Sequence, residues 1–270
     1  MKNIIQRMTL GLALIATTTA AKADDLIING STTVLPIIQK ASETFMKNNP
    51  AVTLSIAGGG SGNGIKALSE GLCQIAMSSR EMKAGEIDDA RAKKVEPYRV
   101  SIAHDAIVPV VHPDNPVKAL SVEQLQGIYS GKITNWKEVG GKDEKIVLFS
   151  RDTSSGTYES WGEMVMKKDK VTRKALLQAS CGAVATAVAK NKRAIGYIGF
   201  GYLNANLKGV EVDGVEVSVD AVLGKQWPIS RELFLYTNGA PQGGVKLFVD
   251  FMLDPQKGQK AVVEAGYIPL

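Results

Sequence analysis

Three loops rich in hydroxyl groups and glycine are the segments of this chain whose residue types could do chemistry. They are Gly30–Thr33 (GSTT), Gly58–Gly64 (GGGSGNG) and Arg151–Thr157 (RDTSSGT). Each follows an apolar run typical of a strand and precedes a run with helical spacing. Hydroxyls, backbone NH groups and a helix N-terminus can therefore face one anion, and Arg151 adds positive charge. The three loops predict a site for a single tetrahedral oxyanion, held mainly by neutral donors.

The first 23 residues have the pattern of a secretory signal peptide. Lys2 and Arg7 give a positive start, residues 8–20 are mostly apolar, and Ala21–Ala23 reads as a small-x-small cleavage site. A retained anchor is the alternative, but the apolar run is shorter than the roughly 18 residues that a membrane span needs. No cysteine lies near the cleavage site, which argues against a lipid anchor. We expect an exported, soluble protein of the periplasm.

Composition indicates a folded globular chain and excludes some function classes. The 270 residues, 44% hydrophobic and 22% charged, suit one large or two medium domains. Without residues 1–23 the net charge falls from +5 to +2, because that segment holds three cations and no acid. This charge is too small, and the cations too scattered, for a nucleic-acid-binding surface.

Cysteine and histidine are too scarce to predict a metal site. Cys73 and Cys181 cannot form a four-thiol cluster, and they are either bridged by a disulfide or buried and free. His104 and His112 lie in apolar or alternating runs typical of structural histidines. We expect no metal and no cofactor.

Strand and helix signals alternate along the chain, which predicts an α/β fold. The polar loops fall after predicted strands, where open α/β sheets bind their ligands. A Ser-x-x-Gln capping box opens a helix at Ser121, and Asp213-Gly214 predicts a hairpin. Predicted strands cover residues 26–29, 52–56, 75–78, 98–112, 146–149, 195–198 and 233–237, and predicted helices cover residues 34–45, 65–72, 182–190, 242–253 and 255–264, with another after residue 156.

Six motifs in sequence order resemble the periplasmic phosphate-binding proteins of phosphate-specific ABC transporters. Each motif alone is weak, but together they span essentially the whole mature chain. The resemblance implies a two-domain type II periplasmic binding fold, with mixed sheets flanked by helices and two hinge crossovers, near residues 102–105 and 228–231. Domain one is then 25–103 plus 231–270, and domain two is 104–230. The motifs are Gly30–Pro36, Gly60–Gly62, Ile75–Arg80, Arg151–Thr157, Ala194–Gly199 and Gly266–Leu270.

The same resemblance implies which residues bind phosphate. Arg151 can donate two parallel hydrogen bonds, which lysine cannot. Simpler roles remain open: helix capping for Thr32 and Thr33, a glycine turn around Ser61, and an ion pair between Arg151 and Asp152. Asp152 can alternatively orient the guanidinium. The implied binding residues are Ser31, Thr32, Thr33, Ser61, Ser79, Arg80, Arg151, Ser155, Gly156 and Thr157.

Ser79 departs from the pattern of the family. Well-studied members have a carboxylate at this position, which accepts the proton of bound phosphate and repels sulfate. A serine hydroxyl imposes a weaker penalty on sulfate, so discrimination between the two anions cannot be carried over. The following Arg80 is either a second positive contact or a solvated side chain.

The resemblance implies that the protein captures inorganic phosphate by closing two lobes and delivers it to ABC permease subunits in the inner membrane. We expect a monomer that performs no chemistry on the phosphate. The alternatives are a secreted or surface adhesion protein on the same fold, and a binder of another oxyanion such as sulfate. A serine hydrolase using Ser155, His104 and Asp105 is disfavoured, because adjacent strand residues point to opposite faces and no Gly-x-Ser-x-Gly elbow is present.

Overall fold

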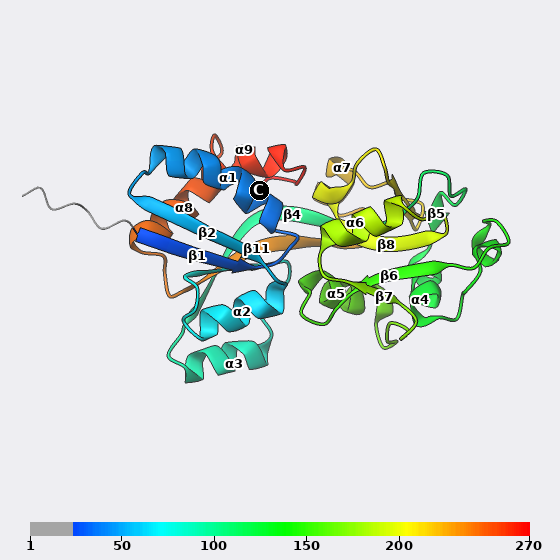
Figure 1. Ribbon diagram of the computed structural model, residues 1–270, viewed down its shortest axis with the longest axis horizontal. Coiled ribbons are helices and arrows are strands. Elements are labelled where there is room, and N and C mark those ends of the chain that lie inside the picture. Colours follow the sequence, from blue (N-terminus) through cyan, green and yellow to red (C-terminus); the bar gives the residue numbers. More distant parts are fainter. Residues whose placement is uncertain (1–23) are drawn as a thin grey trace, which may run out of the picture.

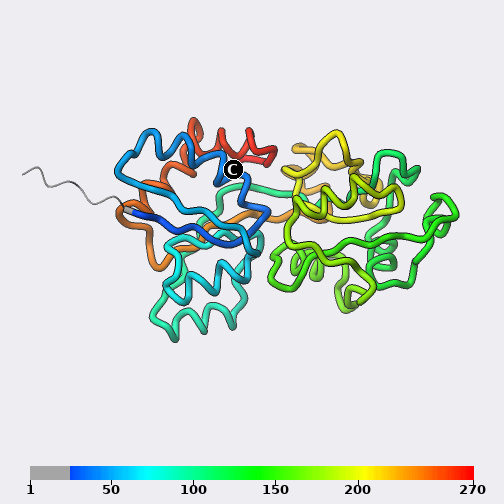
Figure 2. Tube along the Cα trace, viewed as in Figure 1, coloured from blue at the N-terminus to red at the C-terminus, as the bar shows by residue number. Residues whose placement is uncertain are grey.

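Two α/β lobes lie side by side along the longest axis of the molecule (Figures 1 and 2). The computed structural model describes residues 24–270, so the predicted signal peptide lies outside the described residues. Strands β4 (Pro97–Val111) and β11 (Ser230–Asn238) run from one lobe into the other. We call the lobe with β1–β3 lobe one, and the lobe with β6–β8 lobe two.

One mixed sheet runs through both lobes. Its strand order is β2-β1-β3-β11-β4-β8-β6-β7, with β9 pairing beside β4. The pairs within each lobe's outer part are parallel, whereas β11 and β4 are antiparallel to their neighbours. The remaining strands of the sheet are β1 (Asp24–Gly30), β2 (Val52–Gly58), β3 (Ile75–Ser78), β6 (Val147–Arg151), β7 (Leu176–Gln178), β8 (Ala194–Gly199) and β9 (Lys208–Gly209), while β5 (Ala119–Leu120) and β10 (Glu211–Val212) pair separately.

Helices cover the sheet because each presents an apolar stripe to it. In α1 (Leu35–Asn48), Ile37, Ile38, Ala41 and Phe45 recur at helical spacing and are buried. This helix packs with α8 (Gly243–Leu253) and α9 (Gly258–Glu264) on one face of lobe one, and α2 and α3 lie on the other face. The other helices are α2 (Ser61–Ser69), α3 (Ala84–Ala92), α4 (Val122–Ser130), α5 (Gly156–Trp161), α6 (Cys181–Ala189) and α7 (Val219–Leu223).

Separate hydrophobic cores lie in the two lobes. Along β4 the core changes between Ala103, which packs in lobe one, and Ala106, which packs in lobe two. Along the segment that leads into β11, the core again changes, between Ile229 in lobe two and Leu233 in lobe one. Both changes fall beside the predicted crossovers, while the exact domain boundaries stay a prediction.

Most predicted elements are confirmed within a few residues, β7 and α7 were not predicted, and further differences concern α2, the hairpin at Asp213 and α3. Helix α2 begins at Ser61 rather than at residue 65, because its glycines let it approach β1: a Cβ at Gly64 would lie 2.5 Å from Gly30 Cα. The predicted hairpin at Asp213 is reduced to one bridge, since β10 pairs with β5 instead. Helix α3, with only Ala90 buried, was not predicted.

The capping box at Ser121 is confirmed: its Oγ accepts from Gln124 N, and the Gln124 side chain accepts from Ser121 N.

Of the two alternatives for the cysteines, the structure shows the second: Cys73 and Cys181 are both buried free thiols. Among residues 24–270, no helix is both long and apolar enough to cross a membrane.

Candidate oxyanion site

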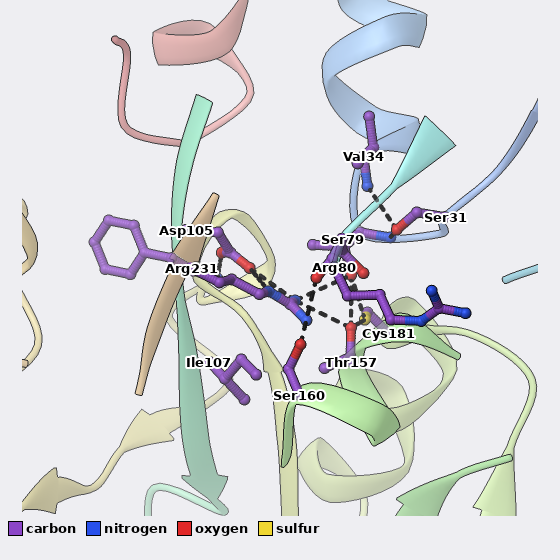
Figure 3. Close-up of polar contacts among 12 residues, drawn as sticks. Ser31, Val34, Ser79, Arg80, Asp105, Ile107, Thr157, Ser160, Cys181 and Arg231 are labelled. Carbon is purple, nitrogen blue, oxygen red and sulfur yellow. Dashed lines mark hydrogen bonds and ion pairs between the residues drawn. The ribbon is translucent and has the colours of Figure 1, made fainter. Parts of the chain in front are cut away.

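The polar loops at the carboxyl ends of β1, β2, β3 and β6 meet where the two lobes touch. Figure 3 shows Ser31, Ser79 and Thr157 from the loops after β1, β3 and β6. Parallel strands end at a common edge, so loops far apart in sequence converge there. Polar side chains are seldom this buried without partners, and the cluster is densely hydrogen bonded. All ten predicted residues are buried: Ser31, Thr32, Thr33, Ser61, Ser79, Arg80, Arg151, Ser155, Gly156 and Thr157.

The hydroxyls of the first loop, Gly30–Thr33, have different partners: one bonds the backbone of its own loop, and another contacts the opposite lobe. Ser31 Oγ accepts from the backbone nitrogens of Thr33 (3.2 Å) and Val34 (3.4 Å), so it organises the turn that enters α1. Thr33 Oγ1 instead lies 2.8 Å from Thr157 Oγ1 of lobe two. Ser31 therefore stabilises the turn before α1, whose N-cap Val34 has no side-chain cap, and Thr33 contacts the other lobe.

Ser61, Ser79 and Gly156 form a close contact between the lobes. Ser61 Oγ accepts from Ser79 N at 3.0 Å and lies 3.3 Å from Ser79 Oγ. A Cβ at Gly156 would approach Ser61 Oγ to 2.3 Å and Ser79 Oγ to 2.7 Å. Glycine is needed at this position because only its bare backbone lets the third loop reach the serine hydroxyls. Ser155 Oγ next to it accepts from Tyr158 N (3.3 Å) and caps α5.

Arg151 is held by backbone carbonyls rather than by a carboxylate. Its Nε donates to Gln178 O (2.9 Å) and its Nη2 to Ala179 O (3.0 Å), which fixes the plane of the guanidinium. Its Nη1 donates across the lobes to Thr32 Oγ1 at 3.1 Å. The side chain is 1% exposed, so its charge acts where water does not screen it.

Asp152 takes neither of the roles considered for it beside Arg151. Its Oδ1 accepts from Ser154 N at 2.8 Å and from Ser154 Oγ. Burial raises the pKa of this carboxyl, but the hydrogen bonds from Ser154 outweigh burial, and the pKa is lowered. Asp152 therefore shapes the third loop, which in turn bonds lobe one through Gly62 N and Ser154 O (3.0 Å).

The Arg80 side chain is buried, and its guanidinium is already paired with carboxylates of the protein. Its Nη1 and Nη2 donate to both oxygens of Glu86 (2.7 Å each), and its Nε pairs with Glu159 of α5. Lys83 donates to the other oxygen of Glu159 at 2.8 Å. We call these four residues the interlobe ion cluster, because Glu159 belongs to lobe two and the rest to lobe one.

Four residues of the site were not predicted from the sequence. Cys181 Sγ lies 3.4 Å from both Thr33 Oγ1 and Arg151 Nη1. Tyr202 donates to Thr32 O at 2.6 Å, and burial raises the pKa of its phenol, so it stays a donor. Asp105 and Arg231 pair beside the threonines (Figure 3). For Asp105, its charge within the mostly apolar run 98–112 could have drawn attention to it as a site residue.

Comparisons with known proteins agree with this architecture. Residues 16–256 match a family model described as a PBP superfamily domain. The phosphate-binding protein PstS of Bacillus subtilis is 33% identical over 246 residues, covering 91% of this chain and 80% of that protein. PstS of Staphylococcus saprophyticus is 34% identical over 255 residues, covering 90% of this chain and 79% of that protein.

Two solved structures extend the likeness to three dimensions. A candidate phosphate ABC transporter substrate-binding protein from Clostridium perfringens, with bound phosphate, has a TM-score of 0.85 and 36% identity, covering 92% of this chain and 100% of that one. An ABC-type phosphate transport receptor from Vibrio cholerae has a TM-score of 0.75 and 31% identity, covering 91% and 100%. The predicted two-lobed periplasmic binding fold is thus confirmed, and the chain belongs to the PstS family of phosphate-binding proteins within the PBP superfamily.

Proposed function

We propose that this protein binds inorganic phosphate between its lobes and delivers it to the permease of an ABC transporter. The observation that carries the proposal is the environment of Arg151: a buried guanidinium that forms no ion pair within the described residues 24–270 and donates to the Thr32 hydroxyl of the opposite lobe. The phosphate-binding names of relatives and the bound phosphate in the Clostridium perfringens structure support the same ligand.

Closure of the lobes is the proposed mechanism of capture. Lobe one supplies the hydroxyls of Thr32, Thr33, Ser61 and Ser79, and lobe two supplies Arg151, Ser155, Thr157 and the backbone at Gly156. Phosphate oxygens would replace direct contacts such as the 2.8 Å bond between Thr33 and Thr157. Excluding water strengthens each donor, because the effective dielectric falls. No bond of the phosphate is made or broken.

Two of the predicted ligands receive a different proposed role. Ser31 shapes the first loop through its bonds to Thr33 N and Val34 N. Arg80 acts within the interlobe ion cluster, because its guanidinium is already bonded to Glu86 and Glu159. Both residues thus support the site without donating to phosphate.

The proposed setting is the periplasm, with residues 1–23 removed as a signal peptide and the mature protein acting as a monomer on permease subunits. Mass spectrometry of the exported protein should find an N-terminus at about Asp24, and light scattering should give the mass of a single chain. A retained N-terminus in the membrane fraction would contradict this setting.

Titration calorimetry with phosphate and with sulfate tests the function. The mature protein is unfolded, dialysed free of anions and refolded before titration. We expect tight phosphate binding, compaction in solution scattering, and stabilisation of about 2.7 kcal/mol at one hundred times the Kd. Sulfate should bind more weakly, because the Ser79 hydroxyl can accept a hydrogen bond from the P–OH group of phosphate, and sulfate has no such group. Absence of heat and compaction with phosphate, or tighter sulfate binding, would refute the proposal.

A matched variant sharpens the question of selectivity. Ser79→Asp restores the carboxylate of well-studied members, and we expect it to widen the preference for phosphate over sulfate. Thr53→Asp, an exposed change on β2, adds the same charge away from the site and should leave the preference unchanged.

A further inference from the structure

Arg231 extends a second guanidinium into the threonine hydroxyls of the candidate site (Figure 3). Its Nη2 lies 3.0 Å from Thr157 Oγ1 and 3.4 Å from Thr33 Oγ1. The side chain is 4% exposed. Arg231 therefore contacts one hydroxyl from each lobe, although it stands on the crossover strand β11 rather than on any of the polar loops.

Asp105 holds this guanidinium in place. Residues 231 and 105 are direct partners in the antiparallel pairing of β11 and β4, so their side chains leave the same face of the sheet. Asp105 Oδ2 accepts from Arg231 Nε (3.0 Å) and Nη2 (2.8 Å), while Oδ1 accepts from Phe200 N (2.9 Å). Burial raises the pKa of Asp105, and pairing with Arg231 opposes that shift.

The hydrogen bonds of this pair leave donors unused. Arg231 Nη1 is buried and has no hydrogen-bond partner among the described residues. Both oxygens of Asp105 already accept hydrogen bonds, and neither accepts from Arg231 Nη1. A buried guanidinium donor without an acceptor is costly, so its retention indicates a partner that the protein itself does not supply.

The threonine hydroxyls are also arranged as donors toward an anion. A hydroxyl has one hydrogen and two acceptor positions. Arg231 Nη2 has two hydrogens: one bonds Asp105 Oδ2, and the other is shared by Thr157 Oγ1 at 3.0 Å and the more distant Thr33 Oγ1 at 3.4 Å. Arg151 donates to Thr32, so Thr32 and Thr157 accept from a cation and keep their hydrogens to give. Thr33 and Thr157 can use only one of their two hydrogens between themselves. Cys181 Sγ lies 3.4 Å from Thr33 Oγ1 and 3.8 Å from Thr157 Oγ1 and is only a weak acceptor for the remaining hydrogen, so a ligand with several oxygens would accept it better.

We propose that Arg231 is a second cationic binding residue of the oxyanion site, which donates to phosphate and polarises Thr33 and Thr157, and that Asp105 is its positioning residue. The inference rests on the proposed phosphate function and adds a residue to it. Because Arg231 contacts a hydroxyl from each lobe, it also links anion binding to closure: its contacts with Thr33 and Thr157 cannot both persist when the lobes separate.

Calorimetric titration with inorganic phosphate on three variants tests this role. The double variant Asp105→Asn/Arg231→Gln removes both charges and leaves no unpaired buried charge, and Arg231→Lys keeps the ion pair but loses the planar set of donors. We expect phosphate Kd to rise about 10- to 100-fold in the double variant and about threefold to tenfold in Arg231→Lys. The control is Arg99→Gln, an exposed arginine of β4 paired with Glu81, which should change Kd less than about twofold.

Thermal unfolding without phosphate separates binding from structural support. Arg231→Lys should melt within about 2 °C of the unmodified protein and still bind more weakly, a split that a purely structural residue would not produce. Unchanged Kd in both Arg231 variants, with the unmodified protein binding phosphate, would overturn the inference alone. Failure of the unmodified protein to bind phosphate would instead overturn the proposed function.

Discussion

Arg80 and Arg151 occupy equivalent places in the two lobes and have opposite electrostatic environments. Each follows a serine near the carboxyl end of a parallel strand: Arg80 lies two residues after β3 in lobe one, and Arg151 is the last residue of β6 in lobe two. Arg80 is bonded to two carboxylates, Glu86 and Glu159, whereas Arg151 is bonded to carbonyls and to a threonine hydroxyl. Both are almost fully buried, so burial does not explain the difference.

The comparison shows that the partners, and not the arginine, decide whether a buried charge is available to a ligand. Carboxylates neutralise Arg80 and make it a structural link between the lobes. Carbonyls orient Arg151, and within residues 24–270 no carboxylate forms an ion pair with it, although Asp152 attracts it at longer range. This arrangement suits an anion that arrives from solvent. A Ser-Arg pair after a strand therefore indicates only where a guanidinium lies, and its partners indicate what it can do.

The largest expected effect on phosphate Kd comes from replacing Arg151 by lysine, with the same replacement at Arg80 for comparison. Arg151→Lys keeps the charge but loses the bonds to Gln178 O and Ala179 O that orient the guanidinium, and we expect phosphate Kd to rise more than about 100-fold. Arg80→Lys should raise Kd less than about tenfold, because Arg80 is not a proposed ligand. Calorimetric titration measures both. A larger loss in Arg80→Lys than in Arg151→Lys would reverse the assignment of roles.

A smaller effect should follow from weakening the interlobe ion cluster. Glu159→Gln removes the carboxylate that joins α5 to Arg80 and Lys83, while Arg80 keeps its pair with Glu86. The closed arrangement should lose about 1 kcal/mol, which corresponds to a Kd about fivefold higher. Solution scattering with phosphate near the Kd should show a smaller compact fraction.

The matched control for that change is Glu163→Gln. Glu163 is exposed one turn further along, and it forms no ion pair within residues 24–270. Losing the same charge at Glu163 should leave the phosphate Kd within about twofold of the value for the unmodified protein. If both variants weaken binding equally, general charge rather than the cluster is responsible.

The sequence predicted the elements and the placement of the polar loops because both depend on local patterns. Alternation in Val52–Ile56 and helical spacing from residue 34 are set by near neighbours, and strand ends locate the loops. The structure brings all ten predicted residues together at the junction of the lobes. Their roles as ligands stay a prediction until binding is measured.

The rest of the site depends on contacts between residues far apart in the chain. The sequence places Arg231 in a predicted crossover without indicating a binding role, and only the pairing of β11 with β4 sets it beside Asp105, 126 positions away. Glu159 lies 76 positions from Lys83. Cys181 is the first residue of α6 and reaches Thr33 only because the lobes meet. Such partners have no local signal.

The smallest expected effect concerns acid stability, where Glu86 distinguishes the neutralised arginine from a surface pair. Burial raises the pKa of Glu86, but hydrogen bonds from Arg80 and Lys83 N outweigh burial, and the pKa is lowered from 4.5. A carboxyl with a lowered pKa in the folded state adds stability above its unfolded pKa and loses it as pH falls through the folded value. Glu86→Gln should therefore lose about 1 kcal/mol of unfolding free energy at neutral pH, and this deficit should shrink as pH falls below about 4.5.

Urea unfolding at neutral and acid pH measures the difference, with Glu96→Gln as its control. Glu96 also pairs with an arginine, Arg91, but both side chains are more than half exposed (62% and 56%). Solvent and salt screen that pair, so its removal should change stability little at either pH. A deficit in Glu86→Gln that stays constant from neutral pH to about pH 3 would mean that packing, and not the charge on Glu86, stabilises Arg80, and the contrast between the two arginines would then be one of shape rather than of electrostatics.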